Sequence, residues 1–227
     1  MTKLLLHQHL GLGDHIDCNG MVRHILKHKD YDCIDLFVKK NNVKMVSFMY
    51  RDDERIKIIP IEGNEYDYVI EYAEKQIDYH LLKVGHEFYD HQDGKNCWEV
   101  FYEQLDLPHD VKFDEFYIEP DPEEEERVFN KLNPSGEDFI FVHDASSVIK
   151  RDLNHRKDLI IVGNDTSENI FHFVKIIKEA KEIHLIESSF KSIVDHLPTD
   201  GKLFFHDFFG AHPFGKTKKE WEVVNES

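Results

Sequence analysis

The sequence has few cysteines, few basic residues and no long apolar run. Its three cysteines, Cys18, Cys33 and Cys97, form no CxxC pair, which is typical of a reducing compartment rather than of a disulfide framework. No stretch reaches the roughly 18 apolar residues of a membrane span, and the Leu4–Leu6 run is followed at once by polar residues, unlike a signal peptide. We therefore expect a cytoplasmic protein without a membrane span.

The scarcity of basic residues limits the possible partners. The chain has 28 Lys and Arg residues against 45 Asp and Glu, which gives a net charge of −17. Nucleic acids and anionic membranes are bound largely by neutralising phosphates with Lys and Arg, so neither is expected as a partner. The sequence also lacks a serine nucleophile elbow and a Walker loop, and His206-Asp207 lacks the second acidic residue of a metal-binding DxD motif.

What the sequence does contain is a regular alternation of predicted strands and helices. Short apolar runs predict strands at residues 3–8, 32–38, 56–61, 80–84, 138–142, 159–162, 183–186 and 202–206. Apolar residues at helical spacing predict helices between most of them, among them one with the apolar face Tyr66, Val69, Ile70, Ala73 and Ile77. This alternation is typical of the α/β class with doubly wound parallel sheets.

The alternation weakens between residues 85 and 119 and then restarts. Asp121 is a candidate helix cap and Pro122 suits the first helical position, so a helix is predicted to begin here. Asp165 and Glu168 have capping-box spacing ahead of a later helix. A chain of 227 residues is long enough for two small domains. We therefore predict two Rossmann-like lobes with parallel sheets, at residues 1–118 and 119–227.

The first predicted strand runs into the sequence Gly11-Leu12-Gly13-Asp14-His15 at the start of a helix. Two glycines let the backbone turn tightly and bring helix N–H groups near a ligand. The residues that follow stand at the carboxyl edge of a parallel sheet, where ligands bind. We predict that Gly11 and Gly13 bind phosphate and that Asp14 and His15 are catalytic, with Asp14 as general base. A helix cap is the alternative interpretation of Asp14.

The second half carries a matching set of polar and charged residues after its predicted strands. These residues are His143, Asp144, Lys150, Arg151, Glu187, Ser188 and Ser189. The last three precede a helix, whose N-terminus offers N–H groups and hydroxyls to an anion. Together the seven predict a phosphate-binding edge, although Ser188 or Ser189 also suits the N-cap of that helix.

Two histidines on the first strand allow a different interpretation. His7 and His9 alternate and would point the same way, as in the metal sites of some metallohydrolases. A complete site would need further ligands, for which the candidates are His143, His184 and Asp207. A metal-dependent hydrolase is therefore one alternative function.

The segment Gly11–Ile16, opening the first helix of a two-lobed α/β protein, resembles the start of heptosyltransferase-like glycosyltransferases of the GT-B fold. Those enzymes carry Gly-Asp at the same strand-to-helix turn. The Glu187-Ser188-Ser189 turn resembles their donor-site Asp-Ser-Gly turn, but it lacks the glycine and the histidine that follows. The segment 139–206 is also similar to glycosyltransferase-like proteins of bacteria and large viruses. The resemblance covers both ends of the chain and little of its middle, and in so short a chain the lobes would be minimal.

The resemblance implies transfer of a hexosyl or pentosyl group from a nucleotide-diphosphate sugar to a glycan or other hydroxyl acceptor. It implies inversion, no metal, and no cofactor besides the donor substrate. Asp14 would take the proton of the acceptor, and Arg23 would bind a phosphate or a carboxylate of the acceptor. The first lobe would bind the acceptor and the second the nucleotide sugar.

The donor-side roles also follow from the resemblance. Lys150, Arg151, Ser188 and Ser189 would stabilise the leaving diphosphate. The donor cleft would be lined by His143 and Asp144, and Glu187 would accept a ribose hydroxyl.

Two further alternatives remain open at this point. A Rossmann-like methyltransferase would use the first glycine loop for its cofactor, but the acidic residue expected at the end of the second strand is misplaced, since Asp35 lies inside that strand. A binding module without catalytic activity is excluded by no feature of the sequence.

Overall fold

The computed structural model describes residues 2–86, 94–145, 150–153, 155–208 and 214–225. The chain forms two compact units, Met1–Glu119 with Pro213–Lys216, and Pro120–His212 with Thr217–Ser227. Near its end the chain therefore leaves the second unit, contributes a short segment to the first, and returns. Whether the units are the predicted acceptor and donor lobes stays a prediction.

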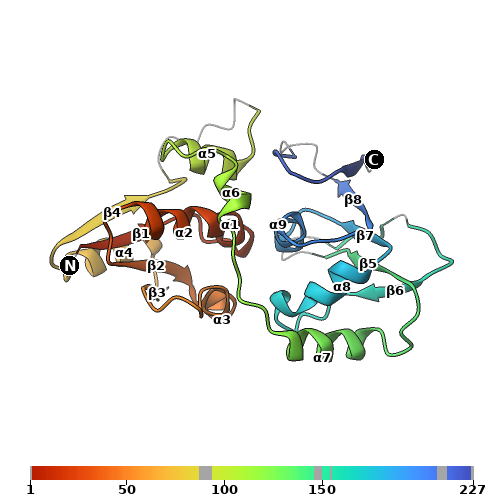
Figure 1. Cartoon of the computed structure of the whole chain (residues 1–227). Coiled ribbons are helices and arrows are strands. Elements are labelled where there is room, and N and C mark those ends of the chain that lie inside the picture. The colour runs from red at the N-terminus through yellow and green to blue at the C-terminus, as the bar shows by residue number, and fades with distance from the viewer. Residues whose placement is uncertain (1, 87–93, 146–149, 154, 209–213, 226–227) are drawn as a thin grey trace. The chain divides into compact units, whose positions relative to one another are not determined.

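The first unit is built on a four-stranded parallel sheet in the order β3-β2-β1-β4 (Figure 1). The strands are β1 (Lys3–His7), β2 (Cys33–Lys39), β3 (Ile56–Ile61) and β4 (Tyr79–Lys83). Leu4, Leu5 and Leu6 point alternately to the two faces of the sheet, and all three are fully buried. Both faces of the sheet are therefore covered, as expected of a doubly wound fold.

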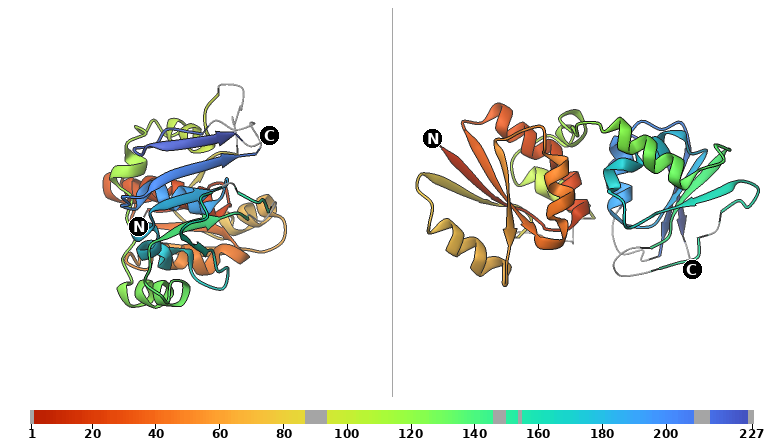
Figure 2. Two further views of the ribbon diagram at one scale, coloured as in Figure 1. Left: turned by 90° about the vertical axis from the view of Figure 1, so that its right-hand side faces the viewer. Right: turned by 90° about the horizontal axis from the view of Figure 1, so that it is seen from below.

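The helices of this unit are α1 (Leu12–Asp17), α2 (Asn19–His28), α3 (Val43–Met49), α4 (Glu65–Ala73), α5 (Cys97–Glu103) and α6 (Val111–Asp114), with a 3₁₀ turn η1 (Lys40–Asn42) before α3. Figure 2 shows α4 on one face of the sheet and α2 and α3 on the other. Of the five residues predicted as the apolar face of α4, only Val69 and Ala73 are buried, whereas Tyr66, Ile70 and Ile77 are exposed. The prediction of that face was wrong for these three residues: α4 ends at Ala73, before Ile77, and it buries only the narrow stripe of Val69 and Ala73.

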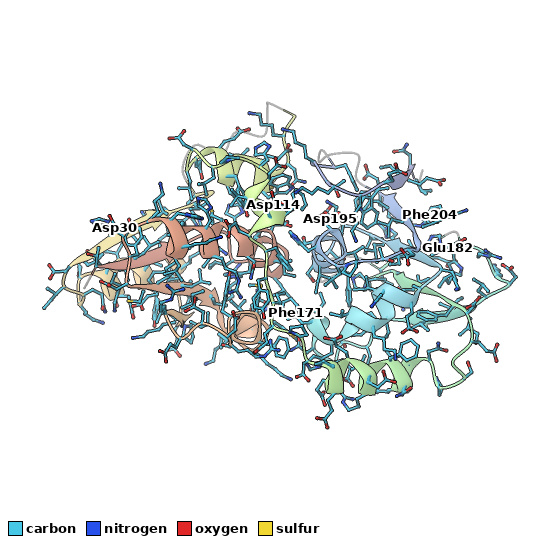
Figure 3. All side chains as sticks on the ribbon, viewed as in Figure 1. Asp30, Asp114, Phe171, Glu182, Asp195 and Phe204 are labelled. Carbon is cyan, nitrogen blue, oxygen red and sulfur yellow. The ribbon has the colours of Figure 1, made fainter. Side chains whose placement is uncertain are left out.

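The second unit has a five-stranded parallel sheet in the order β6-β5-β7-β8-β9. Its strands are β5 (Phe139–His143), β6 (Ile160–Gly163), β7 (Glu182–Leu185), β8 (Lys202–Asp207) and β9 (Trp221–Asn225). The prediction that residues 202–206 form the last strand was wrong, because β9 follows. Asp195, labelled in Figure 3, anchors that strand by accepting hydrogen bonds from Trp221 Nε1 and Thr217 Oγ1, both at 2.9 Å.

The helical segments in the described part of this unit are α7 (Pro122–Leu132), the 3₁₀ turn η3 (Ile170–Phe173), α8 (Val174–Glu179) and α9 (Ser189–His196). Asp121 caps α7 as predicted, accepting a hydrogen bond from the Glu124 backbone N–H at 3.3 Å. The predicted capping box was wrong. Asn169 caps η3 instead, and the carboxylates of Asp165 and Glu168 pair with Lys131 of α7.

The two parallel sheets confirm the predicted α/β class with two Rossmann-like units. In the core of the second unit, Phe141 of β5 contacts Phe173 and Phe190, with ring centroids 5.8 and 5.2 Å apart. This packing fixes α9 beneath the end of β5.

Among the described residues, no helix combines the length and the apolar character needed to cross a membrane.

Candidate functional site

Each sheet has one place where its chain connections diverge to opposite sides, and ligands of open α/β sheets bind at such points, outside the carboxyl ends of the strands. In the first unit the point lies between β1 and β4, and in the second it lies between β5 and β7. Asp14 follows β1, His143 is the last residue of β5, and Ser188 follows β7. The topology therefore places the predicted residues of each unit at its expected ligand edge.

Asp14 occupies the third position of α1, just after β1. Gly11 is the N-cap of this helix, and its backbone gives a hydrogen bond to the Asp14 carboxylate. Burial raises the pKa of Asp14 to about 6, with a further upward contribution from Asp17 and opposing contributions from His9, Gly11 and Lys39. A carboxylate with this pKa is ionised at neutral pH and is a stronger base than an ordinary one, as general-base catalysis requires.

The two glycines of this segment do not provide the predicted tight turn. Gly11 has φ −67° and ψ 148°, which any residue adopts, and Gly13 lies inside α1. Neither is among the residues with positive φ in the described parts of the chain. The prediction of a glycine loop was therefore wrong: β1 passes into α1 through Gln8–Gly11 without left-handed backbone at either glycine.

A buried ion pair that the sequence did not reveal lies beside Asp14. Lys112 of α6 is fully buried, its Nζ lies 2.8 Å from Oδ1 of Asp17, and it sits 4.2 Å from the centroid of the Trp98 ring. Because Asp17 raises the pKa of Asp14, the positive charge of Lys112 limits the repulsion that Asp14 experiences.

His15 is buried inside the first unit. Its ring is fully buried, and Nδ1 lies 2.8 Å from Nε2 of Gln8, so the Gln8 amide donates to it. Burial lowers the pKa of His15 to about 3, and the ring is neutral. A buried neutral ring does not fit the predicted catalytic contact with a substrate. Instead it ties the segment after β1 to the first helix.

Arg23 does not fit its predicted role of acceptor binder. Its guanidinium forms a two-pronged ion pair with Asp52, at 2.8 and 2.9 Å, and donates to the backbone oxygens of Tyr117 and Met49. The guanidinium also lies 5.5 and 5.1 Å from the ring centroids of Tyr50 and Tyr117. These contacts make Arg23 a clamp between segments of the first unit.

Two of the predicted metal ligands, His184 and His9, are already engaged elsewhere. Nδ1 of His184, in β7, lies 3.0 Å from Nε2 of His206. Its Nε2 lies 3.3 Å from Oε2 of Glu182, and its ring stacks on Phe204. In the first unit, His9 Nε2 lies 2.8 Å from the Gly85 carbonyl oxygen. The set predicted for the hydrolase alternative is therefore not supported.

The methyltransferase alternative is also disfavoured. Asp35 lies within β2, is 1% exposed, and accepts hydrogen bonds from Tyr72 Oη at 2.8 Å and Lys3 Nζ at 2.9 Å. A buried carboxylate with these two donors stabilises the sheet and is not placed to meet a ribose at its edge.

At the ligand edge of the second unit, His143 ends β5. It is buried against Phe190, with ring centroids 4.6 Å apart, and burial lowers its pKa to about 4. Its Nδ1 has no hydrogen-bond partner among the described residues. The backbone oxygen of Asp144 accepts a hydrogen bond from the Arg151 N–H at 2.8 Å. The structure therefore brings Arg151 to Asp144, next to His143. Residues 146–149 lie outside the described residues.

Three predicted residues follow β7 at the same edge. Glu187 is exposed. Ser188 occupies the N-cap position of α9, but its side chain makes no capping hydrogen bond, and its buried Oγ has no partner within the described ranges. Ser189 begins the helix. A buried hydroxyl without a partner at a helix N-terminus is suited to an oxygen of an anionic ligand.

The predicted basic residues also lie near this edge. Lys150 is exposed and pairs with Ala145 in an isolated bridge. The Arg151 guanidinium lies 5.4 Å from the ring centroid of Phe208, which follows β8. Arg156, from the same basic stretch, is held by Asp158 and Glu182. The basic groups that the structure leaves at the ligand edge are thus Lys150 and Arg151.

The amino-acid sequence matches no family model and no curated protein. The structure is similar to that of Escherichia coli ADP-heptose lipopolysaccharide heptosyltransferase II, with a TM-score of 0.66 and 12% identity over 99% of this chain and 90% of that one. It is also similar to a glycosyl transferase of family 9 from Veillonella parvula, with a TM-score of 0.61 and 10% identity over 98% and 86% of the two chains. For the E. coli heptosyltransferase WaaC with ADP, the TM-score is 0.51 at 10% identity, over 98% and 92%.

These similarities confirm the fold that the resemblance implied. The fold of the chain is similar to the GT-B fold of family 9 heptosyltransferases over nearly its whole length. At identities of 10–12% the likeness shows the fold alone, and it assigns neither the substrate nor the role of any residue.

Proposed function

We propose that this protein is a glycosyltransferase that moves a sugar from a nucleoside-diphosphate donor to a hydroxyl acceptor. The observation that carries the proposal is the Asp14 carboxylate, with its pKa raised to about 6, at the ligand edge of a GT-B fold. Because a similar structure is named for ADP-heptose, this sugar nucleotide is the first donor to test. The narrower expectation of hexosyl or pentosyl transfer gains no support from the comparisons.

In the proposed reaction Asp14 acts as general base. Its ionised carboxylate takes the proton of the acceptor hydroxyl, whose oxygen forms a bond to the anomeric carbon of the donor. The bond between that carbon and the diphosphate oxygen breaks, and the nucleoside diphosphate leaves with the electron pair. Attack from the face opposite the leaving group inverts the anomeric centre. His15 and Lys112 act as positioning residues, through the segment after β1 and through Asp17.

On the donor side, the proposal uses residues at the ligand edge of the second unit. Lys150 and Arg151 supply positive charge to the leaving diphosphate, and the Ser188 hydroxyl and the N-terminus of α9 supply hydrogen-bond donors. Glu187 accepts a ribose hydroxyl. This set supports a reaction in which protein groups stabilise the leaving diphosphate.

The isosteric variant Asp14→Asn tests the assignment of the base. We expect loss of transfer by at least about 100-fold, in the range typical of a removed general base, with nucleotide affinity nearly unchanged. Asp30→Asn, at an exposed position after α2, is the matched control and should transfer normally. Full activity of Asp14→Asn would overturn the assignment.

A nucleotide screen separates the proposed function from its rivals. Thermal unfolding should be measured with ADP, UDP, GDP, CMP and S-adenosylmethionine. A ligand at a hundred times its dissociation constant adds about 2.7 kcal/mol of stability. Stabilisation by a nucleoside diphosphate supports the transferase, and stabilisation by S-adenosylmethionine alone supports the methyltransferase. Binding without transfer of ADP-heptose or other sugars would point to a binding module.

A further inference from the structure

A second group of side chains meets at the ligand edge of the first unit, apart from Asp14. His7 is the last residue of β1, Glu65 is the first residue of α4, and His86 follows β4. One ligand atom from each lies within 4.8 Å of the others. Nε2 of His7 is 2.8 Å from Oε1 of Glu65, and Nε2 of His86 is 3.8 Å from the same oxygen. Three elements far apart in the sequence thus aim nitrogen and oxygen atoms at one point.

His86 is oriented in the way that metal-binding histidines are. It donates a hydrogen bond to the Gln8 backbone carbonyl, while Nε2 has no partner among the described residues, so the donor is Nδ1. Tyr66 Oη lies 3.3 Å from the same Nδ1. A backbone carbonyl that accepts from one ring nitrogen fixes the tautomer and leaves the lone pair of the other nitrogen for an ion.

The lone pair on Nε2 of His86 faces the negative charge of the Glu65 carboxylate. The His86 side chain is 6% exposed, and its unprotonated Nε2 looks toward a carboxylate oxygen of Glu65. Two hydrogen-bond acceptors that face each other in a buried place repel, unless a cation lies between them. A positive ion between the two atoms would remove this repulsion.

The surroundings of His7 hold its ring in the same place. The ring is fully buried and stacks on the His86 ring with centroids 4.0 Å apart. The edges of Phe37 and Tyr66 enclose it, at 6.1 and 5.8 Å. The Glu65 side chain is 26% exposed, which leaves a path by which an ion can enter.

We propose that His7, Glu65 and His86 bind a divalent transition-metal ion of the zinc type. Two imidazole nitrogens and one carboxylate oxygen are a ligand set that Zn²⁺ takes with a fourth position open to water. Metal–ligand bonds of about 2.0–2.1 Å at tetrahedral angles place ligand atoms about 3.3 Å apart. The observed 2.8 and 3.8 Å separations bracket that value, and the stacked rings, 26° from parallel, would have to turn apart for both lone pairs to meet at the ion.

Binding of the ion moves the proton of the neutral His7 ring from one nitrogen to the other and releases none. His7 Nε2 now lies within hydrogen-bond distance of Glu65, and as a metal ligand it would carry its proton on Nδ1 instead. The charge of Lys83 acts on both His7 and His86 and opposes a cation there, so affinity should rise when that charge is removed. The site goes beyond the proposed function, and no step of sugar transfer is assigned to the ion.

A second cluster in the first unit serves as an internal control. His24, His28 and Glu115 also place ligand atoms within 4.8 Å of one another. Both carboxylate oxygens of Glu115 are already held by Lys27, at 3.2 and 3.0 Å, and the His28 side chain is 44% exposed. A neutralised carboxylate and a solvated imidazole make this cluster the weaker candidate.

The test is calorimetric titration of the metal-free full chain with Zn²⁺, together with the visible spectrum of the Co²⁺-loaded protein. We expect one tightly bound ion per chain, with a tetrahedral Co²⁺ absorption. His86→Ala and Glu65→Gln should each weaken the affinity by about 100-fold or more, whereas His28→Ala should leave it unchanged. Circular dichroism of each variant shows whether it is folded, and Glu65→Gln, at a partly exposed position, is the variant least disruptive to folding.

Three results would overturn the proposal: no stoichiometric binding, loss of binding in His28→Ala alone, or full binding by both Glu65→Gln and His86→Ala. The result is separable from the proposed function. Asp14→Asn should bind Zn²⁺ normally while it fails to transfer sugar, and a protein that binds no metal could still pass every transferase test.

Discussion

A Cβ atom on Gly11 would lie 2.6 Å from Oδ2 of Asp14. The missing side chain at residue 11 therefore leaves the space that the Asp14 carboxylate occupies, while the Gly11 backbone gives that carboxylate a hydrogen bond. The backbone of Gly11, with φ −67°, needs no glycine. Gly11 therefore makes room for the Asp14 carboxylate, and a glycine is not needed there to form a turn.

The variant Gly11→Ala should impair transfer with little effect on stability. The added methyl group displaces the carboxylate, and a misplacement of about 1 Å in a reacting group can lower the rate by about 100-fold. The free energy of unfolding should change by less than about 1 kcal/mol, since the backbone is unstrained. Steady-state kinetics and urea denaturation measure the two effects.

Gly63→Ala is the opposite control. Gly63 has φ +76° with open space around a would-be Cβ, so the substitution should cost about 1–2 kcal/mol of stability and leave the rate unchanged. If Gly11→Ala loses stability and keeps its rate, the carboxylate does not depend on Gly11.

The rate of transfer should rise with pH through the pKa of Asp14. The general base works only when ionised, so kcat/KM should increase between about pH 5 and 7 and level off above, with an apparent pKa near 6. A profile of kcat/KM against pH measures this value. A half-maximum below pH 4.5 would mean that the carboxylate is not the buried one seen here.

The same pKa predicts how stability depends on pH. Asp14 titrates at 3.8 in an unfolded chain and near 6 in the folded one, so the folded state binds its proton more tightly. The stability that protonation supplies is present below pH 3.8 and is lost as the pH rises through 6. Asp14→Asn resembles the protonated form and should therefore gain stability over the wild type across this window, on the order of 1–2 kcal/mol. Urea denaturation of both proteins at pH 4 and pH 7 tests the sign.

Much of the fold could be predicted because apolar runs mark buried parallel strands. Residues 56–61 were predicted as a strand and form β3 with those bounds. The helix α3 was missed because only Val46 and Met49 of its seven residues are buried, too few to show a period. The strand β9 was missed for the same reason: none of its residues is buried, and it is held by backbone pairing and by Asp195.

The site could be predicted only where its residues are close in the sequence. Asp14 could be proposed because it lies in the segment that follows the first predicted strand. Lys112 reaches the same place from a distant helix, and nothing in the sequence links it to Asp17. His86 meets Glu65 because parallel strands bring their carboxyl ends to one edge, and without the strand order this meeting could not be inferred.

Arg23→Lys should lower the free energy of unfolding without changing KM for the acceptor. A lysine cannot form the two-pronged pair with Asp52 or reach the carbonyl of Tyr117 at once, so a loss of about 1–3 kcal/mol is expected. KM for the acceptor should stay within about twofold, because the guanidinium is engaged within the fold. Arg55→Lys, whose pair with Asp53 is half exposed, should cost less than about 1 kcal/mol. A raised KM at unchanged stability would restore the acceptor role of Arg23.

Ser188→Ala distinguishes a ligand-binding hydroxyl from a helix cap. If Ser188 capped α9, its removal would cost about 1 kcal/mol. Because its buried Oγ makes no capping bond and has no partner in the described parts of the chain, we expect the free energy of unfolding to stay the same or rise. The affinity for the nucleoside diphosphate should fall about tenfold, by loss of one hydrogen bond to a charged group.

Asn169→Ala is the matched control, because Asn169 caps η3 through the Phe171 N–H at 3.1 Å. This variant should lose about 1 kcal/mol of stability while its nucleotide affinity stays unchanged. Urea denaturation and isothermal titration with ADP measure both quantities, and a destabilised Ser188→Ala that binds ADP normally would assign the serine to the helix alone.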